Sequence, residues 1–237
     1  MKLADLIQAN KAVWDSYIYH DFVKNLANSK LKKEAFDHYL VQDYLFLKHY
    51  SRVYALGVYK SQNLDDMKFF LSILQDLVNI EIEHHINYCA KFGITQEAMD
   101  ATDEELATIA YTRYVLDVAN MYSIPEILTA LAPCAIGYSV IANAIGDDSA
   151  KLVFKDKNED YKEWIEMYKD DGYTFLVKRF EEFIDKKLDK INLDSKRGQK
   201  LVKIFKNATM CEAGFWEQSF SKFHDKGGFC LIRKIFG

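Results

Sequence analysis

The chain has 237 residues, of which 49% are apolar and 28% charged, a balance that is typical of a folded globular domain and excludes a disordered chain. Lys and Arg number 31 against 35 Asp and Glu, so the net charge of −4 argues against nucleic acid as a partner. With two prolines and ten glycines, the chain has too few turn residues for an all-β fold.

Apolar residues recur at helical spacing along most of the chain. This spacing predicts helices at about 12–27, 31–60, 64–92, 103–121, 124–146, 158–170, 172–190 and 196–224. Asn63 is a candidate N-cap, Gly93 a candidate C-terminal cap, and Thr102 with Glu105 has the spacing of a capping box. The predicted fold class is all-α, a bundle of about seven or eight helices around a central buried helix.

The central helix is predicted from an uncharged segment, 127–146. Its twenty residues are long enough to cross a membrane. However, the segment contains Pro133, Gly137 and Asn143, and no second segment of this kind occurs. We therefore expect a buried helix of a protein with no membrane partner.

The cysteines indicate a reducing compartment. Cys89, Cys134, Cys211 and Cys230 form no CxxC pair and are too sparse for a disulfide scaffold. Residues 1–10 lack the apolar core of a signal peptide. Both observations predict a cytoplasmic protein.

Three predicted helices carry a carboxylate within their apolar stripes. Asp43 lies between Leu40 and Phe46, Glu81 follows Leu77 and Val78, and Glu212 precedes Phe215. A buried carboxylate is costly unless it is paired, and perturbed carboxylates gather at active sites. Each of the three can also be a purely structural group bonded to tyrosine or histidine. Together, they favour a site in the core.

The uncharged helix adds a thiol to this pattern. Cys134 follows Pro133, which kinks a helix, and Tyr138 lies four residues later on the same face. A cysteine in a buried helix is most often an inert core residue. A kink, a tyrosine and an acid beside it raise the odds of a functional thiol. The aromatic residues at helical spacing from these groups suit a flat, polar, heteroaromatic ligand.

Metal and nucleotide sites have weaker support. Glu81 and His84 have the Glu-x-x-His spacing of di-iron bundles, but the chain has no second copy of it. The loops GxxxxGK[ST], GxGxxG and GxSxG do not occur. We therefore expect no metal and no cofactor.

Five segments, in order, resemble the TenA/thiaminase II family over about residues 10–224. They are 42–50 (QDYLFLKHY), 111–112 (YT), 131–134 (LAPC) with Tyr138, 164–168 (WIEMY) and 211–216 (CEAGFW). The resemblance implies the all-helical fold of haem oxygenase without haem, in a single domain at 1–224 followed by a tail at 225–237 of unknown role. It also implies a homo-oligomer, a tetramer.

The implied activity belongs to thiamin salvage. The family hydrolyses 4-amino-5-aminomethyl-2-methylpyrimidine to the 5-hydroxymethyl compound, and many members also cleave thiamin. By the resemblance, Cys134 is the nucleophile and Glu212 the general acid/base. Substrate-binding residues are then Asp43, Phe46, Tyr111, Tyr138 and Tyr168, and Glu81 with His85 forms a supporting pair behind them.

Some residues depart from the family pattern and leave the substrate open. Phe46 stands where many members have Tyr, and residues 135–137 and 213–214 are smaller than is common. Two alternatives to the hydrolase follow from the residues. One is a di-iron oxygenase on the same scaffold with Glu81 and His84 as ligands; the other is a protein that binds aminopyrimidines without turnover.

Overall fold

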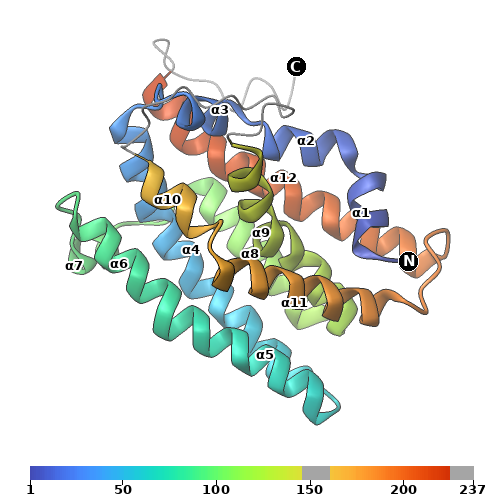
Figure 1. Ribbon diagram of the computed structural model, residues 1–237. Coiled ribbons are helices and arrows are strands. Elements are labelled where there is room, and N and C mark those ends of the chain that lie inside the picture. Colours follow the sequence, from blue (N-terminus) through green and yellow to red (C-terminus); the bar gives the residue numbers. More distant parts are fainter. Residues whose placement is uncertain (146–160, 225–237) are drawn as a thin grey trace.

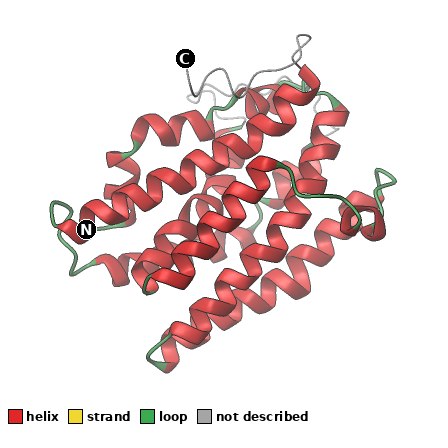
Figure 2. Cartoon of the chain, turned by 180° about the vertical axis from the view of Figure 1, so that it is seen from behind, coloured by secondary structure: helices red, strands yellow, loops and turns green. Residues whose placement is uncertain are grey.

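The computed structural model describes residues 1–145 and 161–224, and every regular element in these ranges is a helix (Figures 1 and 2). The elements are α1 (Leu3–Ala9), α2 (Lys11–Ile18), α3 (Asp21–Ala27), α4 (Lys33–Lys60), α5 (Leu64–Asp76), the π-helical turn η1 (Leu77–Glu81), α6 (Ile82–Ala90), α7 (Gln96–Asp100), α8 (Leu106–Met121), α9 (Ile124–Ala144), α10 (Lys162–Met167), α11 (Asp171–Leu188) and α12 (Lys196–His224). The prediction of an all-α bundle is confirmed.

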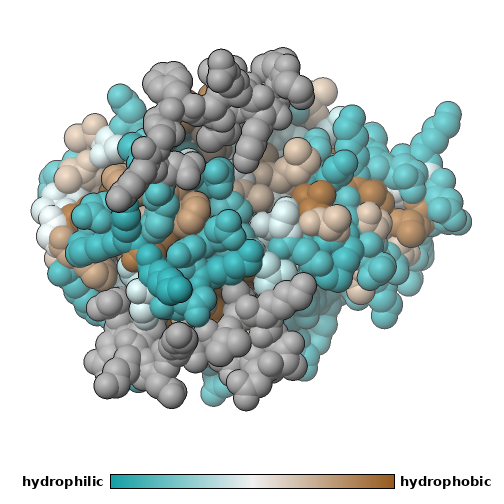
Figure 3. Space-filling model, turned by 90° about the horizontal axis from the view of Figure 1, so that it is seen from above, coloured by the Kyte–Doolittle hydropathy of each residue, from teal (hydrophilic) through white to brown (hydrophobic). Residues whose placement is uncertain are grey.

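Helix α9 lies at the centre of the bundle, as the uncharged segment 127–146 predicts. It packs against α8, α11 and α12, and it continues through Pro133. Among the described residues, it is the one helix that is long and apolar enough to cross a membrane, yet 78% of its most apolar stretch is buried inside the protein. Burial on this scale is typical of the core helix of a globular bundle. The face in Figure 3 carries mostly hydrophilic side chains, with hydrophobic ones in smaller patches.

The two longest helices, α4 and α12, run past this centre and contact each other (Figure 1). Their predicted stripes are buried: Leu40 and Phe46 on α4, and Phe205 and Phe215 on α12, are at most 2% exposed. Because the carboxylates sit within the same stripes, Asp43 and Glu212 point into the core, where they are 5% and 1% exposed.

Helix boundaries follow the predicted caps in two cases out of three. The Asn63 side chain accepts a hydrogen bond from the Asp66 N–H at 2.9 Å, and Gly93 adopts a φ of 77° just after α6. The predicted Thr102 cap is wrong, because α8 begins at Leu106. Glu105 is instead held by the adjoining helix: its N–H donates to Gln42 at 3.0 Å and its carboxyl bonds His38 at 2.9 Å.

The segment predicted as one helix over 64–92 contains a π-helical turn. Within η1, the Ile82 N–H donates to the Leu77 carbonyl, five residues back. This widened turn changes which side chains face the core, and Val78, predicted to be internal, is 44% exposed. His85 and Tyr88 lie on the core side beyond it. Such turns often accompany functional sites.

Short helices account for the other differences. The segment predicted at 12–27 divides into α2 and α3, because the His20 ring caps α3 by accepting from the Phe22 N–H at 3.1 Å. Helices α1 and α7 were not among the seven or eight predicted. The start of the helix expected at 158–170 and the tail at 225–237 lie outside the described residues.

Candidate active site

Four ionisable side chains, from four different elements, come together around the middle of α9. They are Asp43 of α4, Glu81 of η1, Cys134 of α9 and Glu212 of α12. The charges of the three carboxyls each raise the pKa of the Cys134 thiol, which places all of them within electrostatic reach of one point. The sequence predicts this convergence, since each lies in an apolar stripe.

Glu212 is the most deeply buried of the three carboxyls. Burial raises its pKa to about 8, and the groups that face the carboxyl, the Tyr111 hydroxyl first and then the Cys134 thiol and the Tyr17 hydroxyl, limit the rise. The Tyr111 hydroxyl donates to Glu212 Oε1 at 2.8 Å. A carboxyl with a pKa near neutrality gains and loses a proton readily at physiological pH, as a general acid/base requires.

The Cys134 thiol is held in its protonated form. Burial raises its pKa well above the ordinary value, and the charges of Glu212, Asp43 and Glu81 add to this effect. The side chain nevertheless keeps partial solvent exposure. Cys134 therefore needs a base beside it to become a thiolate, and Glu212 is the neighbour whose charge influences it most.

Asp43 is also shifted towards its neutral form. Burial raises its pKa well above the ordinary value, followed by the charges of Glu81 and Glu212, whereas a hydrogen bond from Tyr39 lowers it. The His85 Nδ1 lies 3.6 Å from Asp43 Oδ2, and its Nε2 donates to the Leu40 carbonyl at 2.8 Å. Because burial lowers the His85 pKa to about 4, this ring is neutral at pH 7.

The structure places His85 against Asp43 rather than against Glu81. Among the described residues, no hydrogen bond or ion pair joins Glu81 to His85. Burial raises the Glu81 pKa to about 7. The supporting role expected of Glu81 and His85 as a pair therefore stays a prediction. His85 itself lies against Asp43.

Aromatic rings form the walls of the site. Phe46 stacks on Tyr111 with ring centroids 4.6 Å apart, which joins α4 to α8. The ring centroids of Tyr138 and Tyr168 lie 4.9 Å apart. Trp164, four residues before Tyr168, packs edge-on against the Tyr168 ring. All of the predicted aromatic residues are thus in or beside the site, and their faces suit a flat ring.

Four tyrosines join this wall without having been predicted. Tyr39 approaches Tyr138, with hydroxyl oxygens 3.5 Å apart, and Tyr50 donates to the Leu131 carbonyl at 3.0 Å. Both lie on the predicted Asp43 stripe, four residues before it and seven after, so periodicity contained a signal for them. Tyr173 of α11 and Tyr17 of α2 feel the charge of Glu212, and no local pattern marks either.

A di-iron site has no matching cluster in residues 1–145 and 161–224. These ranges contain no group of three or more His, Cys, Asp and Glu side chains that could hold a metal ion. His84, the proposed partner of Glu81, is exposed on α6.

Comparison with known proteins decides the family. The family model described as TENA/THI-4/PQQC matches residues 7–222. The chain belongs to this family. A solved structure described as a TenA family transcription regulator, from Silicibacter sp. TM1040, has a TM-score of 0.84 and 34% identity, covering 92% of this chain and 96% of its own.

Other relatives extend the comparison to fold and activity. Several curated ones are named aminopyrimidine aminohydrolase; that of Halalkalibacterium halodurans is 30% identical over 92% of this chain and 95% of its own length. A domain from Shewanella denitrificans with a haem-oxygenase-like fold superposes with a TM-score of 0.72 at 14% identity, covering 97% and 99% of the two chains. The predicted haem-oxygenase-like fold of this TENA/THI-4/PQQC member is therefore confirmed.

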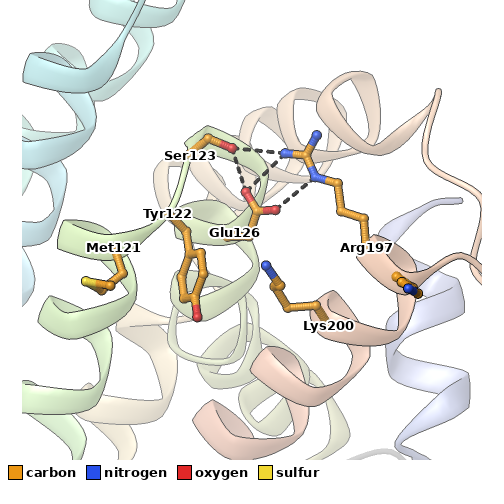
Figure 4. A pocket seen from close by; sticks show the side chains of 7 residues that line it. Met121, Tyr122, Ser123, Glu126, Arg197 and Lys200 are labelled. Atoms are coloured by element: carbon orange, nitrogen blue, oxygen red, sulfur yellow. Dashed lines mark hydrogen bonds and ion pairs between the residues drawn. The ribbon is translucent and has the colours of Figure 1, made fainter.

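A separate surface pocket of about 640 Å³ lies between the α8–α9 turn and the start of α12 (Figure 4). None of the predicted site residues of this family member lines it. Its floor is an ion pair: Arg197 donates from Nε to Glu126 Oε1 at 2.9 Å, and from Nη2 to Oε2 at 3.1 Å. Burial opposes ionisation of Glu126, but hydrogen bonds from Arg197 and Ser123 outweigh it and lower the pKa of this carboxyl.

This ion pair predicts a stability effect. Arg197→Ala leaves a carboxylate that is 4% exposed without its counter-charge, and we expect a loss of about 2 kcal/mol in urea unfolding at pH 7. Because the Glu126 pKa is lowered in the folded state, the stabilisation is present above pH 4.5 and disappears as the pH falls below it. Lys200→Ala is the control: its ammonium lies 4.6 Å from the Tyr122 ring and is expected to contribute under about 1 kcal/mol. Equal losses in the two variants would contradict this role for Arg197.

Proposed function

We propose that this protein hydrolyses 4-amino-5-aminomethyl-2-methylpyrimidine to 4-amino-5-hydroxymethyl-2-methylpyrimidine in thiamin salvage, and that thiamin is a second substrate. The observation that carries the proposal is the meeting of Cys134, Glu212 and Asp43 inside one aromatic wall. The relatives named aminopyrimidine aminohydrolase support it.

Asp43 is suited to recognise the aminopyrimidine edge. This edge presents a ring nitrogen, which accepts a hydrogen bond, beside an amino group, which donates one. A neutral carboxyl offers the complementary pair, an O–H donor and a C=O acceptor. Burial favours this neutral form of Asp43, and the neutral His85 behind it adds no charge that would ionise it.

Phe46 and Tyr111 provide one flat wall for the ring, and Tyr138 and Tyr168 another. Since stacked aromatic contacts recognise shape more than composition, the walls tolerate substitution on the pyrimidine. Phe46 contributes its face without the hydroxyl of a tyrosine. We therefore assign specificity for the amino edge to Asp43.

The chemistry begins with proton transfer from the Cys134 thiol to Glu212. The sulfur adds to the ring carbon beside the one that carries the aminomethyl arm, and the loss of aromaticity lets ring electrons expel the amine. Glu212 returns the proton to the leaving group. Water then adds to the exocyclic carbon, the C–S bond breaks, and the thiol is restored. In the net reaction, the aminomethyl compound and water give the hydroxymethyl compound and ammonia.

The excess of carboxyls favours a cationic substrate. Asp43, Glu81 and Glu212 lie around the thiol, and the largest charge effects on its pKa come from these three carboxyls. The protonated aminomethyl group and the thiazolium ring of thiamin both carry positive charge. Such a ligand lowers the thiol pKa and so activates Cys134 as it binds.

The direct test is chromatographic. Purified protein is incubated with the aminomethylpyrimidine and with thiamin in parallel, and release of the hydroxymethyl compound is measured. We expect release from at least one substrate, and the ratio identifies the preferred one. Folded protein that binds either compound by calorimetry but releases no product would replace the hydrolase with a binding role. The homotetramer and the cytoplasmic location stay predictions, and native mass measurement tests the first.

A further inference from the structure

Tyr17 of α2 has a buried hydroxyl group with no hydrogen-bond partner in the part of the chain that the structure describes. The side chain is 0% exposed. A buried hydroxyl without a partner costs free energy and is rare in native proteins. An unpartnered buried hydroxyl therefore indicates a hydrogen bond that forms in another state of the site.

The position of this hydroxyl depends on a glycine in the central helix. A Cβ at residue 137 of α9 would lie 2.5 Å from the Tyr17 hydroxyl oxygen, closer than atoms can approach. Any other residue at position 137 would therefore displace the phenol. Gly137 is three residues after Cys134, so the hydroxyl reaches α9 within one turn of the thiol.

Two indole rings hold the phenol in this place. Trp14 meets it edge-on with centroids 5.7 Å apart, and Trp216 stacks beside it at 6.2 Å. Trp216 is four residues after Glu212 on α12, and these two side chains therefore lie on one face of the helix. The Tyr17 hydroxyl thus lies between the helix that carries the thiol and the helix that carries the acid.

The groups whose charges act most on this hydroxyl come from four helices. Glu212 of α12 exerts the strongest charge effect on it, followed by Cys134 of α9, Tyr173 of α11 and Tyr39 of α4. All four of these groups are acids, and each raises the pKa of the Tyr17 hydroxyl. Glu212 is the strongest of these as a hydrogen-bond acceptor, since carboxylates form stronger bonds than neutral groups do.

We propose that Tyr17 is a positioning residue for Glu212, whose hydroxyl donates to the Glu212 carboxylate opposite Tyr111 through the space that Gly137 leaves open. The role rests on the proposed function of Glu212 as acid/base. Tyr111 holds Oε1 at 2.8 Å. A second donor stabilises the carboxylate after it has lost its proton, and it fixes the direction in which the acid faces the thiol.

The test reads the proton on Glu212 directly. The carboxyl C=O band of Glu212 is assigned by infrared difference spectroscopy as the band that Glu212→Gln removes, and it is titrated in wild type and in Tyr17→Phe. Because the hydroxyl stabilises the charged form, we expect its loss to raise the midpoint by about one pH unit. The pH limb of kcat that Glu212 controls should move by the same amount.

Tyr88→Phe is the matched control. Tyr88 also has a buried hydroxyl without a partner among the described residues, but the charges that act most on it are those of Glu163, Cys89, Tyr161 and Asp37. We expect the Glu212 titration midpoint in Tyr88→Phe to equal that of wild type. Equal midpoints in wild type and in Tyr17→Phe would overturn the proposal.

Gly137→Ala provides a second variant, which leaves the hydroxyl in the chain and moves it. The added methyl displaces the phenol, so the Glu212 titration midpoint should rise as it does in Tyr17→Phe. An unchanged midpoint would count against the proposal. Failure of the proposed function is separate: a wild type that releases no product still shows whether Tyr17 controls the Glu212 proton, since the infrared titration requires no turnover.

Discussion

Cys134→Ser is expected to lower release of the hydroxymethylpyrimidine by at least about a thousandfold, because a hydroxyl in this site cannot supply the nucleophile. Its ordinary acidity is far weaker than that of a thiol, and the carboxyls around position 134 weaken it further. Substrate binding should persist, since Asp43 and the aromatic walls are untouched. Product release by chromatography and binding by calorimetry separate the two effects.

Cys211→Ser is the matched control for this variant. Cys211 is also a partly buried thiol, one residue before Glu212, and burial raises its pKa to about 12. Adjacent helix residues point about 100° apart, so Cys211 faces away from the site. Full activity in Cys211→Ser and its loss in Cys134→Ser are expected. Activity retained by Cys134→Ser would contradict the thiol mechanism and leave Glu212 as the base for a direct attack by water.

Glu212→Gln is expected to have two opposite effects, at least about a hundredfold loss of turnover and a gain in stability. Folding raises the pKa of Glu212 from 4.5 to about 8. Below pH 4.5, the carboxyl is protonated in both states and costs nothing. Between pH 4.5 and 8 the unfolded chain releases the proton more readily, and this lowers the free energy of unfolding. Glutamine removes this cost and still accepts from Tyr111.

Thermal unfolding across pH measures the second effect. At pH 8, we expect Glu212→Gln to unfold about 4 °C or more above wild type, with the difference shrinking to zero near pH 4.5. Glu126→Gln is the matched control, with the opposite sign: the pKa of this carboxyl is lowered by its partners, so its loss should destabilise the protein at neutral pH. A destabilised Glu212→Gln would show that the carboxylate is paired in the folded protein.

Periodicity predicted most of the bundle and the acids of the site for one physical reason. A carboxylate that replaces an apolar residue in a 3.6-residue repeat must face inward, as Asp43 and Glu212 do. The same argument located Tyr111 and Tyr138 only together with the family resemblance, because aromatic residues on an apolar face look like ordinary core.

Other features had no signal in local sequence. Whether a helix widens into a π turn depends on its neighbours, so Val78 was expected inside and lies 44% exposed. The Thr102 cap failed because Glu105 is engaged by Gln42 and His38 of another helix. Tyr17 is far in sequence from every site residue, and its approach to Gly137 depends on how α2 packs against α9.

The surroundings of Cys134 also govern its chemistry between turnovers. Peroxides and electrophiles attack thiolates, and a thiol whose pKa is well above its ordinary value stays protonated in the empty site. Under the proposed function, a positively charged substrate would reverse this condition only while it is bound. Burial and the ring of carboxyls therefore make the cysteine less open to oxidation, and under the proposed function its reactivity depends on the substrate that it attacks.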